Sequence, residues 1–583
     1  MANARSLAAL GALFALVACG GGGGSPSPAP TPAPAPAPAP GAASAELSVT
    51  LAGGASPGID HLWVTVTGLA MHANAGQVYG DGDAGWVAMT LPDPVSVDLA
   101  DPSLSQGQSV ALLKQAAATV GTYGQIRLVL ASSDPNATLK PSARTAGLAF
   151  NDQVQYTDGA GVHVVPLEIP DPQAGIRLQQ QFTVAADATT PLAIQFDAAS
   201  SLVRRASPTG VDRFTLRDEL QLYNQQFLTV LSGIGLAIDG SVFDSVSGQL
   251  DTRQFCTGSS HAGCIHDVVA SATSVSADGL FHQEVRSVNV SATGAFILYP
   301  LPPVPLFDVV IRGGNMETIV VRNVFVDTTG LLRPFPAALS STTTPLVPVL
   351  NTAETTVTVQ GALAPRASRV LFGQTIAGSG GSKPDVPYQL AQGTADPATG
   401  LLAHTITLPA GPIHDAAFNT STDGRGTPPT FTSVTPKEGS GAWSVWSEGT
   451  LADATSAFTV KAAGVTSVAA PTPVRRAGFV DGTLTVTLSG ASSNGADTAE
   501  VVVTNAGGTV AVADVSSLLA AGGPATFTLP SGTSAAAPGA ALYGVAIHTW
   551  KAGADATTGR WTRTSVPANL ATSATASVAV TLP

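Results

Sequence analysis

Charge is what this sequence has least of. Lys, Arg, Asp and Glu together make up 11% of its 583 residues, against roughly 25% in typical soluble proteins. The formal net charge is −13, and no stretch combines clustered Lys and Arg with aromatic residues, so we expect no nucleic-acid partner. Hydrophobic residues make up 44%, which excludes general disorder because such a chain can bury enough apolar surface to fold.

Long apolar runs are also rare, and the one that is present stands at the start of the chain. Residues 1–18 carry one positive side chain, Arg5, followed by LAALGALFALVA. This length is typical of the hydrophobic part of a signal peptide and is too short for a membrane-spanning helix. We therefore expect residues 1–18 to direct export and to be removed.

The end of this leader, Leu16-Val17-Ala18-Cys19, resembles the lipobox of bacterial lipoproteins. The resemblance implies cleavage before Cys19, acylation of its thiol and amino group with chains such as palmitate, and, from Gly20, an address at the outer membrane. Two or three acyl chains anchor a protein stably, since each buried methylene contributes about 0.8 kcal/mol. Ordinary secretion remains the alternative, and the sequence leaves open whether the protein faces the periplasm or the cell surface.

Residues 19–44 cannot build a core. Gly20 to Gly24 should be flexible, whereas Pro26 to Pro40 alternates proline with small residues. Such a tract favours polyproline II and extends about 45 Å at ~3.1 Å per residue. We therefore expect an anchored stalk, which holds folded domains away from a membrane.

Cysteine is also rare. Beyond Cys19 the chain has two cysteines, Cys256 and Cys264, within the segment FCTGSSHAGCIHD. Export into oxidising surroundings favours a disulfide between them, worth roughly 2–3 kcal/mol on the chain-entropy model. Two cysteines with His261 and His266 could instead form a tetrahedral zinc set. The spacing matches no familiar zinc pattern, so we expect the disulfide, with no metal and no other cofactor.

Strand patterns dominate from residue 46 onward. In HLWVTVTGL the residues Leu62, Val64 and Val66 alternate with polar or aromatic ones, and TLTVTLSG repeats this alternation. Helical periodicity is scarce; SVALLKQAAATVG at 109–121 and SSLLAAGG at 516–523 are the best candidates. Many short strands with turn-rich gaps predict an all-β fold of tandem antiparallel β-sandwiches, either immunoglobulin-like or transthyretin-like.

The first third of the folded chain carries a recognisable set of segments. GIDHLWVTVTGLAMHA, GTYGQIRLVLA and IQFDAASSLV follow one another as in the bacterial family of domains of unknown function numbered 4382, which residues 45–223 resemble. The resemblance implies a fold and a habitat among exported lipoproteins, and it implies no activity. Further on, GSVFDSVSGQL and TGAFILYPLPPVPLFDVVIRG resemble the carboxypeptidase-regulatory, transthyretin-like sandwich, which implies a support or binding module over residues 228–350.

These patterns divide the chain into six parts. We expect a lipoprotein signal peptide at 1–18, an acylated cysteine and linker at 19–44, and sandwiches at 45–226, 227–350, 351–470 and 471–583. The last boundary rests on Pro471 and Pro473, which interrupt any strand.

Several side chains of the first domain admit two interpretations. Tyr123, two residues after Gly121, suits a phenol packed on a corner with its hydroxyl bonded to the backbone. Arg127 within an apolar strand needs a carboxylate if it is buried, and Asp98 or Asp197 could supply it. The same Arg-Asp pair could instead hold a ligand.

The sequence offers only weak candidates for a metal site or a sugar-binding site. Asp81 and Asp83 in YGDGDAGW offer at most a weak calcium contact, because the loop is too short for an EF-hand. Convergence of His61, His72 and His163 in the first domain stays open, because their spacing does not show it. The two tryptophans of GAWSVWSEG, at 443 and 446, would point to opposite faces of a strand and would not form a joint sugar platform.

A complete catalytic set is missing. GTSAAAP, with Ser534, looks like the serine box of subtilases, but that mechanism needs an upstream histidine, which the family presents before Gly-Thr. None of the nine histidines precedes glycine. We therefore expect a lipid-anchored envelope protein, not an enzyme, that binds, adheres to or organises an unknown envelope protein or glycan. A serine hydrolase using Ser534 and a metal-binding lipoprotein remain alternatives.

Overall fold

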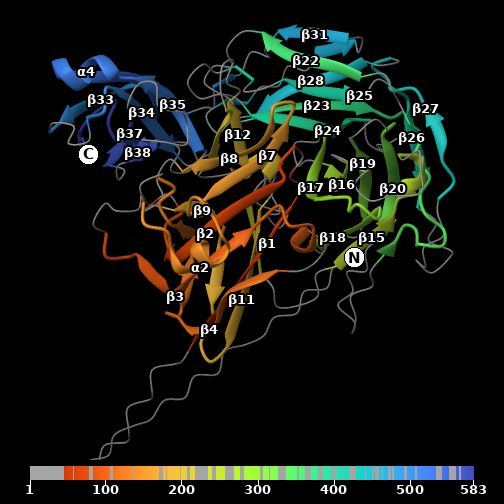
Figure 1. Ribbon diagram of the computed structural model, residues 1–583, viewed down its shortest axis with the longest axis horizontal. Coiled ribbons are helices and arrows are strands. Elements are labelled where there is room, and N and C mark those ends of the chain that lie inside the picture. The colour runs from red at the N-terminus through yellow and green to blue at the C-terminus, as the bar shows by residue number, and fades with distance from the viewer. Residues whose placement is uncertain are drawn as a thin grey trace, which may run out of the picture. The chain divides into compact units, whose positions relative to one another are not determined.

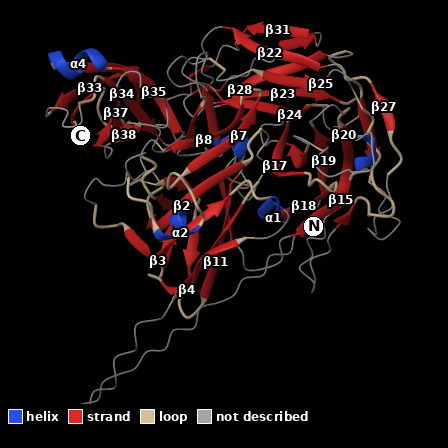
Figure 2. Ribbon diagram, in the orientation of Figure 1, coloured by secondary structure: helices blue, strands red, loops and turns tan. Residues whose placement is uncertain are grey.

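The computed structural model describes residues 45–582 with interruptions, and almost every regular element in them is a strand (Figure 2). The longer interruptions are 78–82, 170–174, 206–210, 217–233, 239–243, 256–264, 276–280, 326–336, 361–368, 379–384, 395–400, 419–428, 534–540 and 551–559, and several shorter ones lie between them. The described α-helices are short: α1 (Pro102–Ser105), α2 (Pro141–Thr145), α3 (Ala198–Ser201) and α4 (Ser516–Ala521). The predicted all-β fold class is confirmed.

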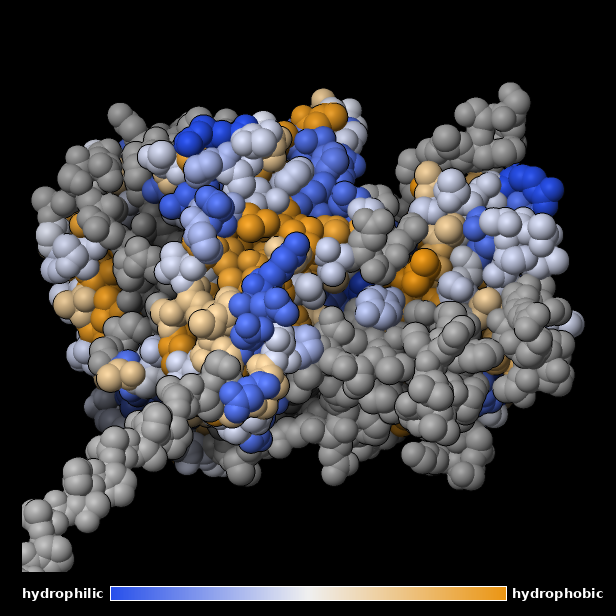
Figure 3. All heavy atoms as spheres, turned by 90° about the horizontal axis from the view of Figure 1, so that it is seen from below, coloured by the Kyte–Doolittle hydropathy of each residue, from blue (hydrophilic) through white to orange (hydrophobic). Residues whose placement is uncertain are grey.

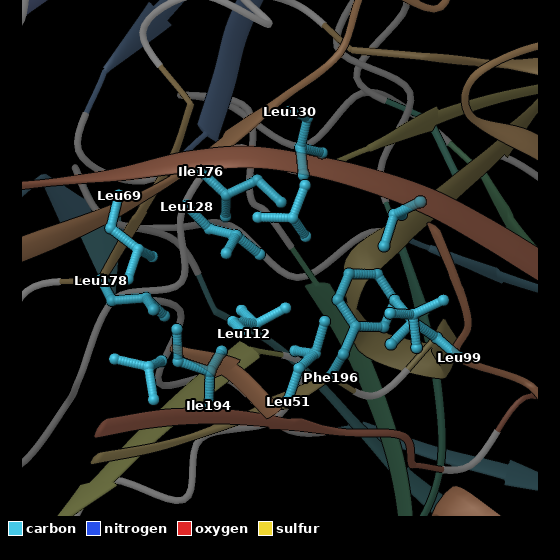
Figure 4. Close-up of a cluster of buried hydrophobic side chains, with 14 of the residues drawn as sticks. Leu51, Leu69, Leu99, Leu112, Leu128, Leu130, Ile176, Leu178, Ile194 and Phe196 are labelled. Atoms are coloured by element: carbon cyan, nitrogen blue, oxygen red, sulfur yellow. The ribbon is translucent and has the colours of Figure 1, made fainter. Parts of the chain in front are cut away.

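The first hydrophobic core lies between two sheets. One has the strand order β14-β11-β1-β4, and the other has the order β12-β13-β8-β7-β2-β6-β9, with β3 beside β2. Leu51 and Ile194 of the first sheet face Leu69 and Leu128 of the second (Figure 4). The strands are β1 (Glu46–Ala52), β2 (His61–His72), β3 (Val87–Asp98), β4 (Val110–Ala117), β6 (Gln125–Leu130), β7 (Gln153–Asp158), β8 (Gly161–Glu168), β9 (Ile176–Leu178), β11 (Thr189–Phe196), β12 (Leu202–Arg205), β13 (Arg213–Leu216) and β14 (Ile234–Ile238).

The alternation that predicted β2 is confirmed, because its predicted inward residues are at most 1% exposed. The helix predicted at 109–121 is wrong, since residues 110–117 form β4 and pair with β1. A register shift explains the error. Leu47 and Val49 of β1 lie opposite Ala116 and Leu113 of β4, so β4 uses three residues where β1 uses two. The bulge spaces inward residues as a helix would.

The largest sheet joins segments on both sides of residue 350. Its order is β27-β26-β20-β19-β16-β17-β24-β23-β28-β29-β32, with β30 beside β28, and its central strands run side by side in green and teal (Figure 1). The strands are β16 (Val269–Val275), β17 (His282–Asn289), β19 (Leu306–Arg312), β20 (Ile319–Phe325), β23 (Arg369–Thr375), β24 (Pro387–Thr394), β26 (Ile413–Ala417), β27 (Thr432–Val434), β28 (Ala442–Glu448), β29 (Ala452–Asp453), β30 (Phe458–Lys461) and β32 (Val474–Arg475). Parallel pairs β17–β24 and β20–β26 cross residue 350, so the division there into two sandwiches stays a prediction.

Smaller sheets cover both faces of this large sheet. The sheet β18-β15-β21 shares one core with it, and the sheet β25-β22-β31 shares another. Trp443 belongs to the second core, whereas Trp446 packs with Phe281 and Leu371 in a separate cluster. The prediction that the two tryptophans point to opposite faces of a strand is confirmed. The strands of the covering sheets are β15 (Asp244–Gln249), β18 (Ala295–Leu301), β21 (Ala337–Ala338), β22 (Glu354–Gln360), β25 (Ile406–Pro409) and β31 (Gly464–Ala469).

Residues 479–582 form a further sandwich around a core of their own. Its sheets have the orders β36-β33-β40 and β35-β34-β37-β38, with β39 beside β37. Leu484, Val486 and Leu488 point into the core as predicted, and the helix expected at 516–523 is present as α4. The strands are β33 (Phe479–Ser489), β34 (Thr498–Asn505), β35 (Gly508–Asp514), β36 (Pro524–Gly532), β37 (Leu542–Trp550), β38 (Arg560–Thr562), β39 (Val566–Asn569) and β40 (Thr575–Thr581).

The described surface reflects the low charge of the sequence. In the view of Figure 3, apolar and weakly polar residues separate the strongly hydrophilic ones, and Val162 and Val480 are each more than 60% exposed. None of the described helices is long and apolar enough to cross a bilayer.

Candidate functional site

The densest group of buried ionisable side chains lies on one face of the large sheet. We call it the junction cluster, and it consists of His282, Glu284, Asp308, Arg312 and Tyr388. Strands β17, β19 and β24 supply these residues. The cluster lies where β17 pairs with β24 through His282 and Tyr388, and therefore where the two segments on either side of residue 350 meet.

The aromatic half of the cluster is a stacked pair resting on a carboxylate. The rings of His282 and Tyr388 lie with their centroids 4.0 Å apart and their planes at 15°. The Tyr388 hydroxyl donates to Asp308 Oδ2 at 2.7 Å, and the backbone N–H of Asn323 donates to Asp308 Oδ1 at 2.8 Å. His282 Nδ1 is 3.6 Å from Asp308 Oδ2, and neither ring nitrogen of His282 has a hydrogen-bond partner within the described residues.

The ionic half of the cluster depends on a bulge. Across the register shift between Ala272 and Thr273 of β16, Ala272 pairs with Arg286 whereas Thr273 pairs with Glu284. The shift places Glu284 on the same side of the sheet as Ser271. There Glu284 Oε2 accepts from Ser271 Oγ at 2.7 Å and from Arg312 Nη2 at 2.9 Å.

Burial sets the protonation states. It lowers the pKa of His282 below its ordinary value of 6.5, and the charge of Asp308 opposes the shift only in part, so the imidazole is neutral at neutral pH. Burial and the neighbouring Asp308 carboxylate raise the pKa of the Tyr388 phenol far above its ordinary range. The Tyr388 hydroxyl therefore keeps its proton and remains a donor to Asp308.

The junction cluster connects strands and is not accessible to a substrate. The side chains of His282, Glu284, Asp308 and Arg312 are at most 12% exposed, and Tyr388 is fully buried. They therefore present almost no surface to a substrate. Their hydrogen bonds and ion pair instead connect three strands that come from distant parts of the sequence.

A second buried charge group links still more distant segments. Arg213 of β13 donates to both oxygens of Glu168, at 2.7 and 3.0 Å, and also to Glu500 Oε1 of β34 at 3.3 Å. Burial lowers the pKa of Arg213, but the two carboxylates outweigh burial and raise that pKa above its ordinary value. The guanidinium is held charged between β8 and β34.

The turn before β2 makes a third connection. Arg286 of β17 is 1% exposed and donates from Nη2 to the carbonyl of Gly53 at 2.8 Å. The Asn289 side chain donates to Ser56 Oγ at 2.8 Å and accepts from the Ser56 N–H at 3.1 Å. Gly53 and Ser56 are thereby fixed to β17.

The ion pair expected between Arg127 and Asp98 is not formed. Asp98 Oδ2 is 2.6 Å from His61 Nδ1, and its other oxygen accepts two backbone N–H groups. Asp98 lies opposite Trp63 and Arg127 opposite Ala70, which places them about 23 Å apart along β2 at ~3.3 Å per residue. Asp197, the other expected partner, lies outside the described residues.

Arg127 has a polar and aromatic environment of its own. Its Nε donates to Gln125 Oε1 at 3.3 Å, its Nη2 approaches the carbonyl of Gln77 at 3.5 Å, and its guanidinium carbon lies 5.2 Å from the centre of the Trp86 ring. A buried guanidinium so placed is held by hydrogen bonds and a cation–π contact. Its role in ligand binding stays a prediction.

The three histidines of the first domain do not converge. Each lies beside its own aspartate: His61 with Asp98, His72 with Asp83 at 3.5 Å and His163 with Asp158 at 2.8 Å. Asp83 also accepts from the N–H of Gly85 at 2.6 Å, and its expected partner Asp81 lies outside the described residues. Among the described residues no group of three or more acidic, histidine or cysteine side chains could hold a metal ion.

The remaining predicted residues have two outcomes. Tyr123 is 5% exposed and its hydroxyl donates to the carbonyl of Thr119 at 2.8 Å, which confirms the predicted corner. Cys19, Cys256, Cys264 and Ser534 lie outside the described residues, together with His261 and His266, so the acylation, the disulfide, the zinc set and the serine box stay predictions.

The junction cluster was not predicted from the sequence. The signal was present as ionisable residues two or four positions apart in apolar strands, in HQEVR and FDVVIR. Such a pattern normally indicates a solvent-exposed face, and only the covering sheet shows that the face is buried.

Comparisons with known proteins support the first domain. Residues 44–217 match the family model described as "Domain of unknown function (DUF4382)", as the sequence resemblance implied. The transthyretin-like resemblance of residues 228–350 stays a prediction. No curated protein matches the chain.

Solved structures of bacterial proteins, among them pilins, align with the chain only loosely. The Bacillus anthracis TIE protein is 9% identical, with 90% of this chain and 69% of that chain covered and a TM-score of 0.14. The Corynebacterium diphtheriae major pilin SpaA is 9% identical, with 73% and 99% covered and a TM-score of 0.13. A streptococcal ancillary pilin is 11% identical, with 58% and 99% covered and a TM-score of 0.12. Scores of this size do not establish a shared fold, so these structures carry no argument about function.

Proposed function

We propose that this protein is a lipid-anchored component of the cell envelope that binds or organises other envelope components without catalysis. One observation carries the proposal: the buried charged groups connect segments distant in sequence. Arg312 with Glu284 and Arg213 with Glu168 and Glu500 hold strands together, where an enzyme would display such groups in a cleft. A chain that uses its few charges in this way is suited to presenting a rigid surface.

The anchor is the first part of the proposal to test. Cells that produce the full chain are labelled with radioactive palmitate and then fractionated, and Cys19→Ser serves as the control. We expect label in the outer-membrane fraction for the natural chain and loss of both label and membrane association for Cys19→Ser. Label that persists in the variant, or a mature N-terminus elsewhere, would contradict the anchor.

The binding role is tested on intact cells. Chemical crosslinking of cells that carry the full chain, followed by purification under denaturing conditions, should recover a reproducible envelope protein or glycan. Protease treatment of the same cells shows whether the folded part faces outward. A chain that crosslinks nothing, at native abundance and with several linker lengths, would contradict a scaffolding or adhesion role.

Two measurements separate this role from the chemical alternatives. A serine-directed phosphonate should not label the chain. Labelling that disappears in Ser534→Ala would instead show a serine hydrolase. Thiol counting after anaerobic purification should find Cys256 and Cys264 oxidised, and free thiols with one bound zinc would show a metal-binding protein.

A further inference from the structure

The outer edge of strand β40 suggests an interaction that goes beyond the proposed function. In the sheet β36-β33-β40, β33 is central and pairs with β40 in parallel through seven consecutive residue pairs. Among the described residues no strand pairs with the other side of β40. An edge of this kind presents a row of backbone N–H and C=O groups to any strand that approaches.

The two edges of this sheet differ in how they are protected. Strand β36 carries Pro524 and Pro530, which lack the N–H that a neighbouring strand would use. Strand β40, with the sequence TASVAVT, has no proline and no charged residue, and its pairing with β33 shows no register shift. Proline, inward charges, edge lysines and bulges are the usual protections against strand addition, and β40 lacks all of them.

The inward face of β40 is incompletely covered. Ala576 and Val578 point toward the core of the sandwich but are only partly buried. The corresponding inward residues of the central strand, Leu484 and Val486, have no exposure at all. A further strand beside β40 would bury Ala576 and Val578 more completely, because it would extend the apolar layer past the present edge of the sheet.

The sequence of β40 is complementary to itself. In an antiparallel pair centred on Val578, residue 578 plus k meets residue 578 minus k, so Thr575 meets Thr581 and Ser577 meets Ala579. Residues that meet have the same parity, and inward residues therefore face inward in both strands. Although the chain carries a net charge of −13, two copies of this strand would meet without like charges.

We propose that β40 pairs antiparallel with β40 of a second copy of this chain, so that two three-stranded sheets become one six-stranded sheet across a two-fold axis. Such an interface is isologous and closes on itself. Seven residues a side make a small interface, well below the area of a stable dimer. Tethering both copies to one membrane would raise their effective concentration and favour the pair.

Sedimentation velocity on the full chain in detergent tests the proposal at protein concentrations from about 1 µM to about 1 mM. The test variant is Ser577→Lys, because Ser577 is exposed and points away from the core. Thr526→Lys, at a residue of the protected strand β36 that is also exposed, is the matched control. We expect a monomer–dimer equilibrium that Ser577→Lys weakens at least tenfold and that Thr526→Lys leaves unchanged.

A covalent probe tests the register. The two-fold axis brings the two Val578 Cα atoms to about 4.5–5.5 Å, within the range that a disulfide bridges. Val578→Cys should therefore give a dimer on a non-reducing gel, whereas Val480→Cys, at a highly exposed valine of β33, should not. A monomer at every concentration, equal effects of both lysines, crosslinking through both cysteines, or capture of a different protein on this edge would overturn the proposal.

Discussion

The imidazole of His282 lies flat against the phenol of Tyr388, with 4.0 Å between ring centroids. The contact joins β17 to β24 at the one residue pair, His282 with Tyr388, through which these strands pair within the described part of the chain. A neutral histidine suits this place, because a charged one would lose hydration that nothing nearby except Asp308 replaces. The contact therefore makes the joint between the two segments sensitive to protonation.

The first prediction concerns the loss of folding stability at acidic pH. Since burial lowers the pKa of His282 in the folded chain, the unfolded chain binds a proton at higher pH than the folded chain does. The free energy of unfolding should then fall as pH drops below about 6.5, by up to ~1.4 kcal/mol per pH unit. His282→Phe keeps the stacked ring and removes the proton site, so it should flatten the stability profile between about pH 7 and 5. Urea unfolding of the full chain across this range measures the effect, and a variant that retains the natural slope would contradict it.

The second prediction has the opposite sign. Asp152 is fully buried, with Oδ1 accepting the N–H of Thr65 at 2.6 Å and Oδ2 lacking a hydrogen-bond partner within the described residues. Burial raises its pKa well above the ordinary value of 3.8, so the folded chain keeps a proton that the unfolded chain releases. The stability that this carboxyl contributes is lost as pH rises from about 4.

Asp152→Asn should therefore stabilise the chain at pH 7, because the amide is neutral and its oxygen can still accept from Thr65. Thermal unfolding at several pH values measures this. Asp98→Asn is the control and should destabilise, since Asp98 pairs with His61 and accepts from Leu62 and Ala100. A destabilising Asp152→Asn would show that the carboxyl is ionised in the fold.

The third prediction concerns the buried ion pair. Arg312→Met leaves Glu284 buried without its guanidinium partner and should cost about 3–5 kcal/mol. Adding Glu284→Gln removes the stranded charge, so the double variant should be more stable than Arg312→Met alone. Denaturant midpoints give both values. Arg144→Ala, at an exposed arginine of the short helix α2, should change the midpoint little.

The fourth prediction concerns a close approach beside the junction cluster. A Cβ atom on Gly373 would overlap the carbonyl oxygen of Tyr388 and would lie 2.7 Å from Cη2 of Trp446. Gly373→Ala should therefore displace β24 from β23 and destabilise the chain by about 1–3 kcal/mol. Gly159→Ala, where a Cβ meets nothing within 4 Å, is the control. Near-ultraviolet circular dichroism, which reports tryptophan packing, should change only for the first variant.

Local patterns succeeded where one face of a strand is buried and the alternation is unbroken. Strands β2 and β33 were predicted with their inward residues, because hydrophobic burial and the period of two give the same assignment. Strand β4 was predicted as a helix, because its bulge changes the spacing of inward residues. The expected pair of Arg127 with Asp98 failed for a related reason: the two side chains lie on strands that flank β2, far apart along it.

Composition and short-range periodicity by themselves determined that this chain is all-β with few charges to distribute, since burial of alternating residues is a local property. The resemblance of particular segments implied the DUF4382 domain, which the family model matches at residues 44–217. Only the tertiary structure decided which charges meet. Glu284 reaches Arg312, and Arg213 reaches Glu500, because strand order and register bring distant residues together, and neither is encoded within any one strand.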